Sequence, residues 1–563
     1  MIMLLTVPFP WSCGRYFSRR EKVKRGILPE KRLCFWPKII LFSLWFGLYF
    51  YLCLCHEPFR DEAQSFMIAK HNSIPGIMNF CWEEGHPWLW HLFLYPFAHL
   101  GFPYVGVKWL GFALTALGVG LYVQKSPFPF PVTALTVFLE YSYYCSFGRC
   151  YSLMLLLCML TATSWKNRLC RPWVTSLCLG LLASVHMMAW PLCAILGCIH
   201  IAELVRPQNV PSGGRRNGLL EKRPRLRLLA PPCGLAPAAL FCVPLWPQIE
   251  RTFAKFGWNP VLIFILLGLS AVSAVVLIAL LPWAFRGKEP YYIELGSWFY
   301  AFLPLIAAVS TYLLLNKATS STIAAETNLL HLCEIVPLVL SAAWVAVQSR
   351  RELAASGKTE KTADGEETSD AAAAQNRGTY IRSTAFVSAL VLLWCFYVNT
   401  RDPKLHEKIR MDTKSYYSGS GPLAEYIREN VPKDAVIIAT RKGTNTSVAA
   451  YLDGEYTLTC LLSHEPLYYT KWCTDWNYPI PRSQWLPDLK ALLEEHGELY
   501  VIYSDDTEVS NFADWLWGLV DRGGAQMVYH SNAAGESLKD VPDKYKPIER
   551  CETMGLYKIT AID

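Results

Sequence analysis

Residues Pro37–Cys55 read PKIILFSLWFGLYFYLCLC, an apolar run with a single charged residue, Lys38. At 1.5 Å per helical residue, a run of about 20 residues crosses the ~30 Å hydrocarbon core of a bilayer. Similar runs recur at Val261–Leu281 and Ala385–Cys395. Hydrophobic residues make up 52% of the 563-residue chain and charged residues only 18%, too few charges to cover several soluble domains. The sequence therefore predicts a polytopic α-helical membrane protein.

Basic residues gather at the ends of the apolar runs, a pattern that follows the positive-inside rule and does not indicate a nucleic-acid surface. Residues 1–36 are basic and are expected to stay in the cytoplasm, with the first span retained as an anchor. The loop 206–227 is also basic, and residues 352–381 are expected to form a disordered cytoplasmic loop because of their Ala/Glu/Thr/Lys-rich composition. All strongly basic loops lie on the cytoplasmic side of the membrane if residues 87–100 form a juxtamembrane helix that does not cross it.

The same pattern sets the number of spans and the side of each loop. About eleven spans fit it, at 37–55, 104–123, 130–147, 151–165, 173–189, 190–204, 229–246, 259–284, 291–315, 329–347 and 383–399. Residues 37–400 then form the transmembrane domain, and the loop after the first span lies outside the cytoplasm. Residues 401–563 alternate apolar strands, such as Ala435–Thr440 and Leu499–Ser504, with amphipathic helices. This alternation predicts a small extracytoplasmic α/β domain with some parallel strand pairing.

The first outer loop holds the most unusual residues of the chain. Arg60, Asp61 and Glu62 follow the first span, and a carboxylate there can accept a proton from a hydroxyl group or bind a divalent cation. These residues can instead solvate the end of a helix. Glu83, Glu84 and His86 form a second cluster, which can hold a metal ion or mark the water boundary.

Later outer loops carry basic and aromatic residues. Arg149, followed by Tyr151, lies between two spans, where an arginine either snorkels to the headgroups or binds an anion such as a lipid-linked phosphate. Arg251 and Lys255 are placed to meet a phosphate or, equally, lipid headgroups. His331 lies beside an apolar segment, where ionisable groups are candidates for function, and we include it among the candidate metal ligands.

Taken together, these motifs resemble the GT-C superfamily of membrane glycosyltransferases. Residues Arg60–Glu62 and then Gly85–Trp88 are similar to the first outer loop of dolichyl-phosphate-mannose protein mannosyltransferases and of the lipid A aminoarabinose transferase, enzymes of the glycosyltransferase family 39 type. Residues Arg149–Leu153 are similar to an Arg-x-Tyr-x-Leu pattern in the second outer loop of some bacterial members. The similarity covers residues 37 to about 200, and the later spans only by topology.

The resemblance implies an enzyme that transfers a hexose or pentose, with inversion, from a polyprenyl-phosphate donor to an extracytoplasmic glycan, lipid or protein. It implies catalytic roles for Asp61, as the base on the acceptor, and for Glu62, which helps to shape the site. The residues it implies for substrate binding are Arg60, Glu84, His86, Arg149, Tyr151, Arg251 and Lys255. Some relatives bind the acceptor or a metal ion at the position of Glu84 and His86, so a divalent metal ion is a candidate cofactor. Because the resemblance is to bacterial members, we expect the inner membrane of a bacterial cell envelope.

Two other classes of protein fit the same features. A transporter or lipid flippase can use the outer acidic cluster as a cation or proton site, although the sequence lacks the internal repeats that many transporters show. A non-catalytic membrane scaffold can present the tail, residues 401–563, to partner proteins. The sugar-transfer interpretation is favoured by the order and spacing of Asp61, His86 and Arg149. Its expected partners are the lipid-linked donor, membrane lipids and the acceptor, with no nucleic acid.

Overall fold

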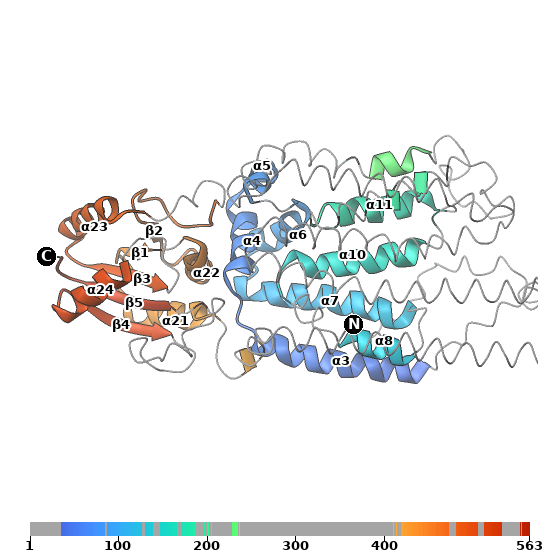
Figure 1. Ribbon diagram of the computed structural model, residues 1–563, viewed down its shortest axis with the longest axis horizontal. Coiled ribbons are helices and arrows are strands. Elements are labelled where there is room, and N and C mark those ends of the chain that lie inside the picture. The colour runs from blue at the N-terminus through green and yellow to red at the C-terminus, as the bar shows by residue number, and fades with distance from the viewer. Residues whose placement is uncertain are drawn as a thin grey trace, which may run out of the picture.

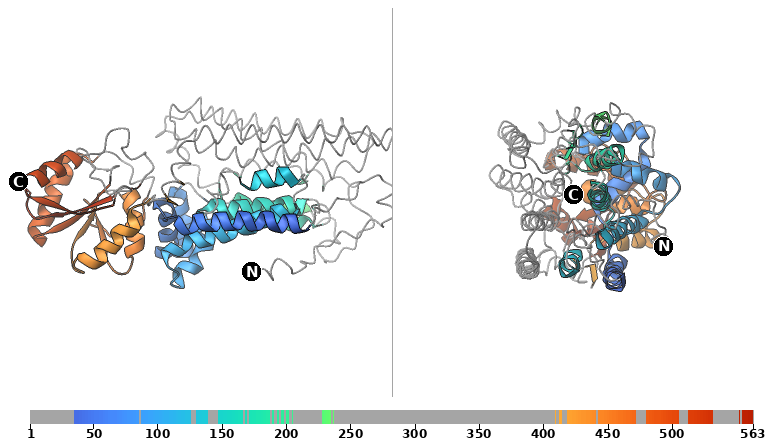
Figure 2. Two further views of the ribbon diagram at one scale, coloured as in Figure 1. Left: turned by 90° about the horizontal axis from the view of Figure 1, so that it is seen from below. Right: turned by 90° about the vertical axis from the view of Figure 1, so that its right-hand side faces the viewer.

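The computed structural model describes residues 35–84, 87–125, 130–138, 147–165, 171–186, 418–440, 442–471, 480–504, 512–531 and 554–562, with some single residues and short stretches between these ranges. The described elements form two parts, a bundle of helices within 35–186 and an α/β domain within 418–562 (Figures 1 and 2). The α/β domain lies at one end of the bundle. The spans predicted between 259 and 399 lie outside the described residues, as do residues 1–34 and the loop 352–381.

Helices of two kinds make up the first part. Helices α3, α7, α10 and α11 run alongside one another and form the body of the bundle. Helices α4, α5 and α6 lie at the end of the bundle nearest the α/β domain (Figure 1). The elements are α3 (Phe35–Cys55), α4 (Arg60–His71), α5 (Ile74–Glu84), α6 (Leu89–His99), the 3₁₀ turn η1 (Tyr104–Gly106), α7 (Val107–Lys125), α8 (Phe130–Val137), α10 (Cys150–Trp165) and α11 (Pro172–Ala183).

Helices α3 and α7 run antiparallel. At one end Lys38 Nζ donates to the carbonyl oxygen of Gln124 at 2.8 Å, and at the other Cys53 Sγ donates to the carbonyl oxygen of Lys108 at 3.7 Å. The intervening residues 56–103 therefore start and finish at the same end of the bundle. This is the arrangement expected if the predicted juxtamembrane helix does not cross. Helix α6, which occupies that stretch, is only about 16 Å long, against the ~30 Å that a crossing requires.

Two of the described helices are long and apolar enough to cross a membrane, Trp36–Cys55 and Tyr104–Lys125. Helix α3 buries Trp45 in the bundle, yet Leu44 is 62% and Leu48 47% exposed on its outer surface. A helix whose buried face and exposed face are both apolar is stable where lipid surrounds the bundle, whereas water favours polar residues on an exposed face. The exposed apolar residues of α3 are compatible with the predicted first span.

Glycines allow α7 and α10 to pack closely. A Cβ atom added at Gly111 of α7 would lie 2.1 Å from the carbonyl oxygen of Phe147, just before α10. Further along α7, Gly118 faces Leu155 of α10, so the two helices run parallel. Two parallel helices need a segment between them that returns in the other direction. Helix α8 (Phe130–Val137) lies in the sequence between them, within the predicted span 130–147.

The α/β domain is a five-stranded sheet with helices on both faces. The strand order is β2-β1-β3-β5-β4, in which β1 is parallel to β2 and β3, and β5 is antiparallel to β3 and β4. Helices α21 and α22 pack on one face, and α23 and α24 on the other. The elements are α21 (Ser420–Asn430), β1 (Ile437–Ala439), α22 (Lys442–Leu452), β2 (Leu458–Cys460), α23 (Arg482–His496), β3 (Leu499–Ser504), α24 (Phe512–Asp521), β4 (Ala525–Ser531) and β5 (Met554–Ile559).

The segments that follow the parallel strands lie against the bundle. Helix α22, which follows β1, contacts α4. The segment after β2 also reaches α4, where Gln64 Nε2 donates to the Thr470 carbonyl oxygen at 2.6 Å and Gln64 Oε1 accepts the Thr470 N–H at 2.8 Å. In open α/β sheets, ligands bind beyond the carboxyl ends of strands where the chain order reverses, and β1 lies at such a reversal. The carboxyl ends of β1 and β2 therefore face α4, the helix that begins at Arg60.

The close approach of α7 and α10 predicts a stability difference between two glycine substitutions. We expect Gly111→Ala to destabilise the protein by about 1–3 kcal/mol, because the added methyl group overpacks the contact with Phe147. Gly47→Ala in α3 is the matched control, since no atom lies within 4 Å of a Cβ added there. Thermal unfolding of the detergent-purified variants measures both. Equal melting temperatures would contradict the close approach.

Candidate active site

A buried carboxylate organises the start of α4. The Glu62 side chain is fully buried and accepts three hydrogen bonds, from the Phe59 N–H at 3.1 Å, from the Gly148 N–H at 2.5 Å and from His56 Nε2 at 2.9 Å. A carboxylate at the third position of a helix satisfies N–H groups that the first turn leaves unpaired, and it is favoured by the helix dipole. Glu62 thereby ties the start of α4 to the end of α3 and to the loop before α10.

The imidazole of His56 lies between two buried carboxylates. Besides Glu62, it contacts Asp412, whose Oδ2 is 2.9 Å from Nδ1, and its ring stacks on Phe147 with 4.4 Å between centroids. Burial by itself would lower the pKa of His56, but the charges of Asp412 and Glu62 outweigh burial and raise that pKa from 6.5 to about 9. His56 is therefore an imidazolium at neutral pH and donates from both ring nitrogens.

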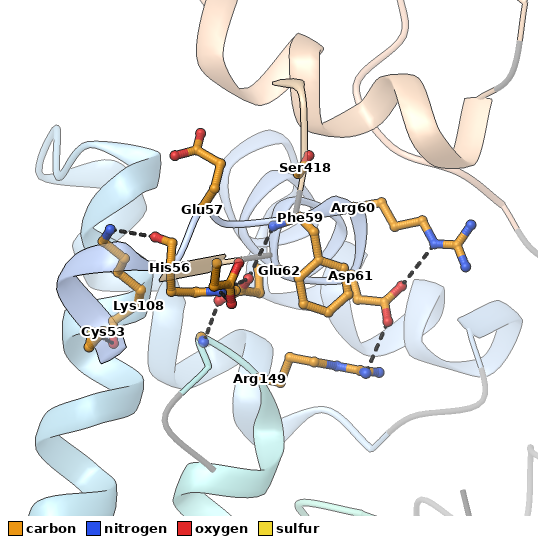
Figure 3. A network of polar contacts seen from close by, with 12 residues as sticks. Cys53, His56, Glu57, Phe59, Arg60, Asp61, Glu62, Lys108, Arg149 and Ser418 are labelled. Atoms are coloured by element: carbon orange, nitrogen blue, oxygen red, sulfur yellow. Dashed lines mark hydrogen bonds and ion pairs between the residues drawn. The ribbon is translucent and has the colours of Figure 1, made fainter. Parts of the chain in front are cut away.

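Asp61 is the next residue to Glu62 but points away from the buried network (Figure 3). Its Oδ2 lies 2.9 Å from Arg149 Nη1, and its Oδ1 lies 3.6 Å from Arg60 Nε. The side chains of Asp61 and Arg149 are 27% and 23% exposed, whereas that of Glu62 is not exposed at all. Successive helix residues differ in direction by about 100°, which is why one carboxylate is buried and the next is accessible. The result is an accessible ion pair at the end of the bundle.

The position of Arg149 depends on its neighbours in the chain. Gly148 allows the loop to approach α4 and α7, since a Cβ atom added there would lie 2.2 Å from Val107 Cγ1 and 2.9 Å from Glu62 Oε1. The guanidinium of Arg149 lies over the ring of Tyr151, 4.9 Å from its centroid. The close backbone approach and the cation–π contact together hold the guanidinium against Asp61.

The structure brings together five of the residues selected from the sequence, namely Arg60, Asp61, Glu62, Arg149 and Tyr151. Glu84 is the last residue of α5, and its side chain lies outside the described part of the structure, as do His86, Arg251, Lys255 and His331. Among the described residues, no group of three or more His, Cys, Asp or Glu side chains is arranged to hold a metal ion. The described site thus offers two guanidinium groups and one accessible carboxylate.

Several residues of the site were missed by sequence reasoning. Lys108 is buried and donates to the His56 carbonyl oxygen at 2.6 Å. A lysine within an apolar segment is a signal that could have found it. His56 carries the same signal, as an ionisable residue at the end of a span. Asp412 and Glu552 lie in the tail, and no spacing or composition distinguishes them from other acidic residues there.

Comparison with known proteins does not assign a family. No protein-family model matches the chain, and comparison with curated proteins finds no significant match.

The charge on His56 predicts a pH-dependent stability. Because its pKa is higher in the folded state than in the unfolded chain, its stabilising contribution is complete below about pH 6.5 and disappears as the pH rises through about 9. The shift corresponds to about 3 kcal/mol. We expect the melting temperature of His56→Gln to lie well below that of wild type at pH 6, and the gap to narrow above pH 9. A gap that stays constant from pH 6 to 10 would contradict the charged state.

Proposed function

We propose that this protein is an integral membrane glycosyltransferase that transfers a sugar from a polyprenyl-phosphate donor to an extracytoplasmic acceptor. The observation that carries the proposal is the accessible pair of Asp61 and Arg149, 2.9 Å apart, at the starts of α4 and α10. Inverting transfer needs a base for the acceptor and a cation for the leaving phosphate. A carboxylate and a guanidinium held side by side can supply both.

In the proposed reaction the acceptor oxygen attacks the anomeric carbon of the sugar while the bond from that carbon to the phosphate oxygen breaks. Asp61 accepts the proton of the acceptor. The polyprenyl phosphate departs with the bonding electrons and one more negative charge. Arg149 donates hydrogen bonds to it, and a guanidinium fixed in advance stabilises this developing charge more strongly than the ground state. Arg60 is a second guanidinium beside Asp61, 3.6 Å from its Oδ1.

The position of the pair suits a lipid-linked donor. Helices α3 and α7 have the length and hydropathy of spans, and the pair lies at the starts of α4, a few residues after α3 ends, and of α10. A donor whose isoprenoid chain lies in the bilayer presents its phosphate at the headgroup level, which is where such helices end. The charge pattern of the loops supports an extracytoplasmic site, in keeping with the inner membrane of a bacterium.

Asp61→Asn is the direct test of the proposed base. The substitution keeps the size of the side chain and removes its charge, so we expect sugar transfer to fall about 10²–10⁴-fold while the protein stays folded. The assay is transfer of radiolabelled sugar from polyprenyl-phosphate donors in membranes that carry each variant. Asp434→Asn, at an exposed position after α21, is the matched control and should retain full transfer.

The outcomes of this assay separate the candidate functions. Unchanged transfer by Asp61→Asn would remove Asp61 from the mechanism. No transfer by the wild type from any polyprenyl-phosphate sugar would contradict the enzyme, and the transporter or flippase and the scaffold would then be the functions to test.

Arg149→Lys tests the proposed phosphate contact. Lysine keeps the charge but loses the planar fork and the stacking over Tyr151. We expect kcat to fall about 10²-fold or more, since one preorganised donor to a developing anion contributes that much. Arg428→Lys, in an exposed ion pair with Glu455, is the control. A change confined to KM would show that Arg149 contributes equally to ground-state binding, against the role proposed here.

A further inference from the structure

Polar contacts from the α/β domain run along the whole segment that carries Asp61. These pairs include, in chain order, Glu57–Tyr451, Arg60–Glu552, Gln64–Thr470 and Lys70–Asp453. Contacts at both ends and in the middle of a short helix determine its rotation as well as its position. The direction in which Asp61 points therefore depends on how the α/β domain docks.

Glu552 makes the contact nearest to Asp61. Its carboxylate is buried and accepts the Arg60 N–H at 3.1 Å and 3.3 Å from its two oxygens, and the Ser418 hydroxyl at 2.7 Å. The backbone of the same residue is fixed as well, because its carbonyl oxygen accepts the Gly419 N–H at 2.8 Å. Burial raises the pKa of Glu552 from 4.5 to about 7, although Arg60 and Ser418 act in the opposite direction. This carboxylate is held rigidly at the first turn of α4.

The guanidinium of Arg60 is shared between two carboxylates. Its Nε lies 3.6 Å from Asp61 Oδ1 and 3.8 Å from Glu552 Oε1. Arg149 occupies the other oxygen of Asp61 (Figure 3). Asp61 is thus flanked by two guanidinium groups, one positioned by the bundle and the other by a residue of the α/β domain.

We infer that the C-terminal α/β domain is part of the Asp61 site, and that Glu552 is the positioning residue through which it holds Arg60 and the first turn of α4. The kinetic consequences rest on the proposed function, whereas the structural ones do not. The site is then complete only when the α/β domain is docked on the bundle.

The inference has a definite electrostatic consequence. Charged groups around Asp61 include Arg60 and Glu62 from α4, Arg149 from the loop before α10, and Glu552 from the α/β domain. Removing the charge of Glu552 frees Arg60 to pair more closely with Asp61, and it also removes a nearby negative charge. Both effects favour the ionised form of Asp61 and make it a weaker base.

The kinetic test compares Glu552→Gln with wild type in the full-length protein. Glutamine keeps the shape and can still accept the Arg60 N–H. Because Glu552 is ionised mainly above about pH 7, we expect kcat of Glu552→Gln to fall about tenfold or more at pH 8. We also expect the change in rate that titration of Glu552 near pH 7 gives the wild type to be absent from the pH–rate profile of the variant. Loss of a merely structural contact would not remove this pH dependence. Glu455→Gln removes a carboxylate from another Glu–Arg pair of the same domain and should leave both quantities unchanged.

A second test does not require enzyme activity. Hydrogen–deuterium exchange of the peptide that covers residues 57–66 is compared between wild type and Glu552→Ala. Loss of the acceptor for the Arg60 N–H should raise exchange at the start of α4 about tenfold or more, whereas Glu455→Ala should not change it.

The two tests separate the inference from the proposed function. If the wild type transfers sugar but Glu552→Gln shows the wild-type kcat and pH profile, and exchange is unchanged, the positioning role is wrong and the enzyme stands. If the wild type transfers no sugar but Glu552→Ala raises exchange at the start of α4, the proposed enzyme is wrong and the structural role of Glu552 stands.

Discussion

The hydrogen bonds to Glu62 are the interaction on which the arrangement of the site depends. Its donors come from three segments: the residue after α3, the residue before α4 and the loop before α10. A buried carboxylate without partners costs several kcal/mol, so the folded state is favoured only when all three segments supply their donors together. None of them can shift without leaving a buried charge unsatisfied. The same network orients Asp61, since the helix that starts here directs consecutive side chains to different sides.

The protonated state of His56 completes this network. The positive charge of the His56 imidazolium compensates the carboxylates of Glu62 and Asp412. Without it, burial of these carboxylates in the apolar end of the bundle would be costly. Asp412 belongs to the segment that leads into the α/β domain, so the same cation links the bundle to the tail. The tail thus contributes acidic groups at two points, Asp412 at His56 in the buried network and Glu552 at Arg60. Docking of the α/β domain and the geometry of Asp61 are thus physically coupled.

Much of the local structure could be predicted from the sequence. The strand at 499–504 lies where the residue pattern predicted it, because periodicity of burial is a local property. Strand β2 could not be predicted, since three residues are too few to establish an alternation, and its conformation depends on pairing of Leu458 with Ile437. The antiparallel place of β5 between β3 and β4 also depends on contacts between segments far apart in the chain.

The candidate site shows the same division. By itself, the sequence determined that Asp61 and Glu62 lie just beyond one apolar run and that Arg149 lies just before another, because hydropathy and charge are properties of neighbouring residues. Only the tertiary structure decided that Arg149 meets Asp61, that Glu62 is buried while Asp61 is accessible, and that Glu552 reaches Arg60. Those outcomes depend on close backbone approach at Gly148 and on the docking of a separate domain. Neither can be read from spacing along the chain.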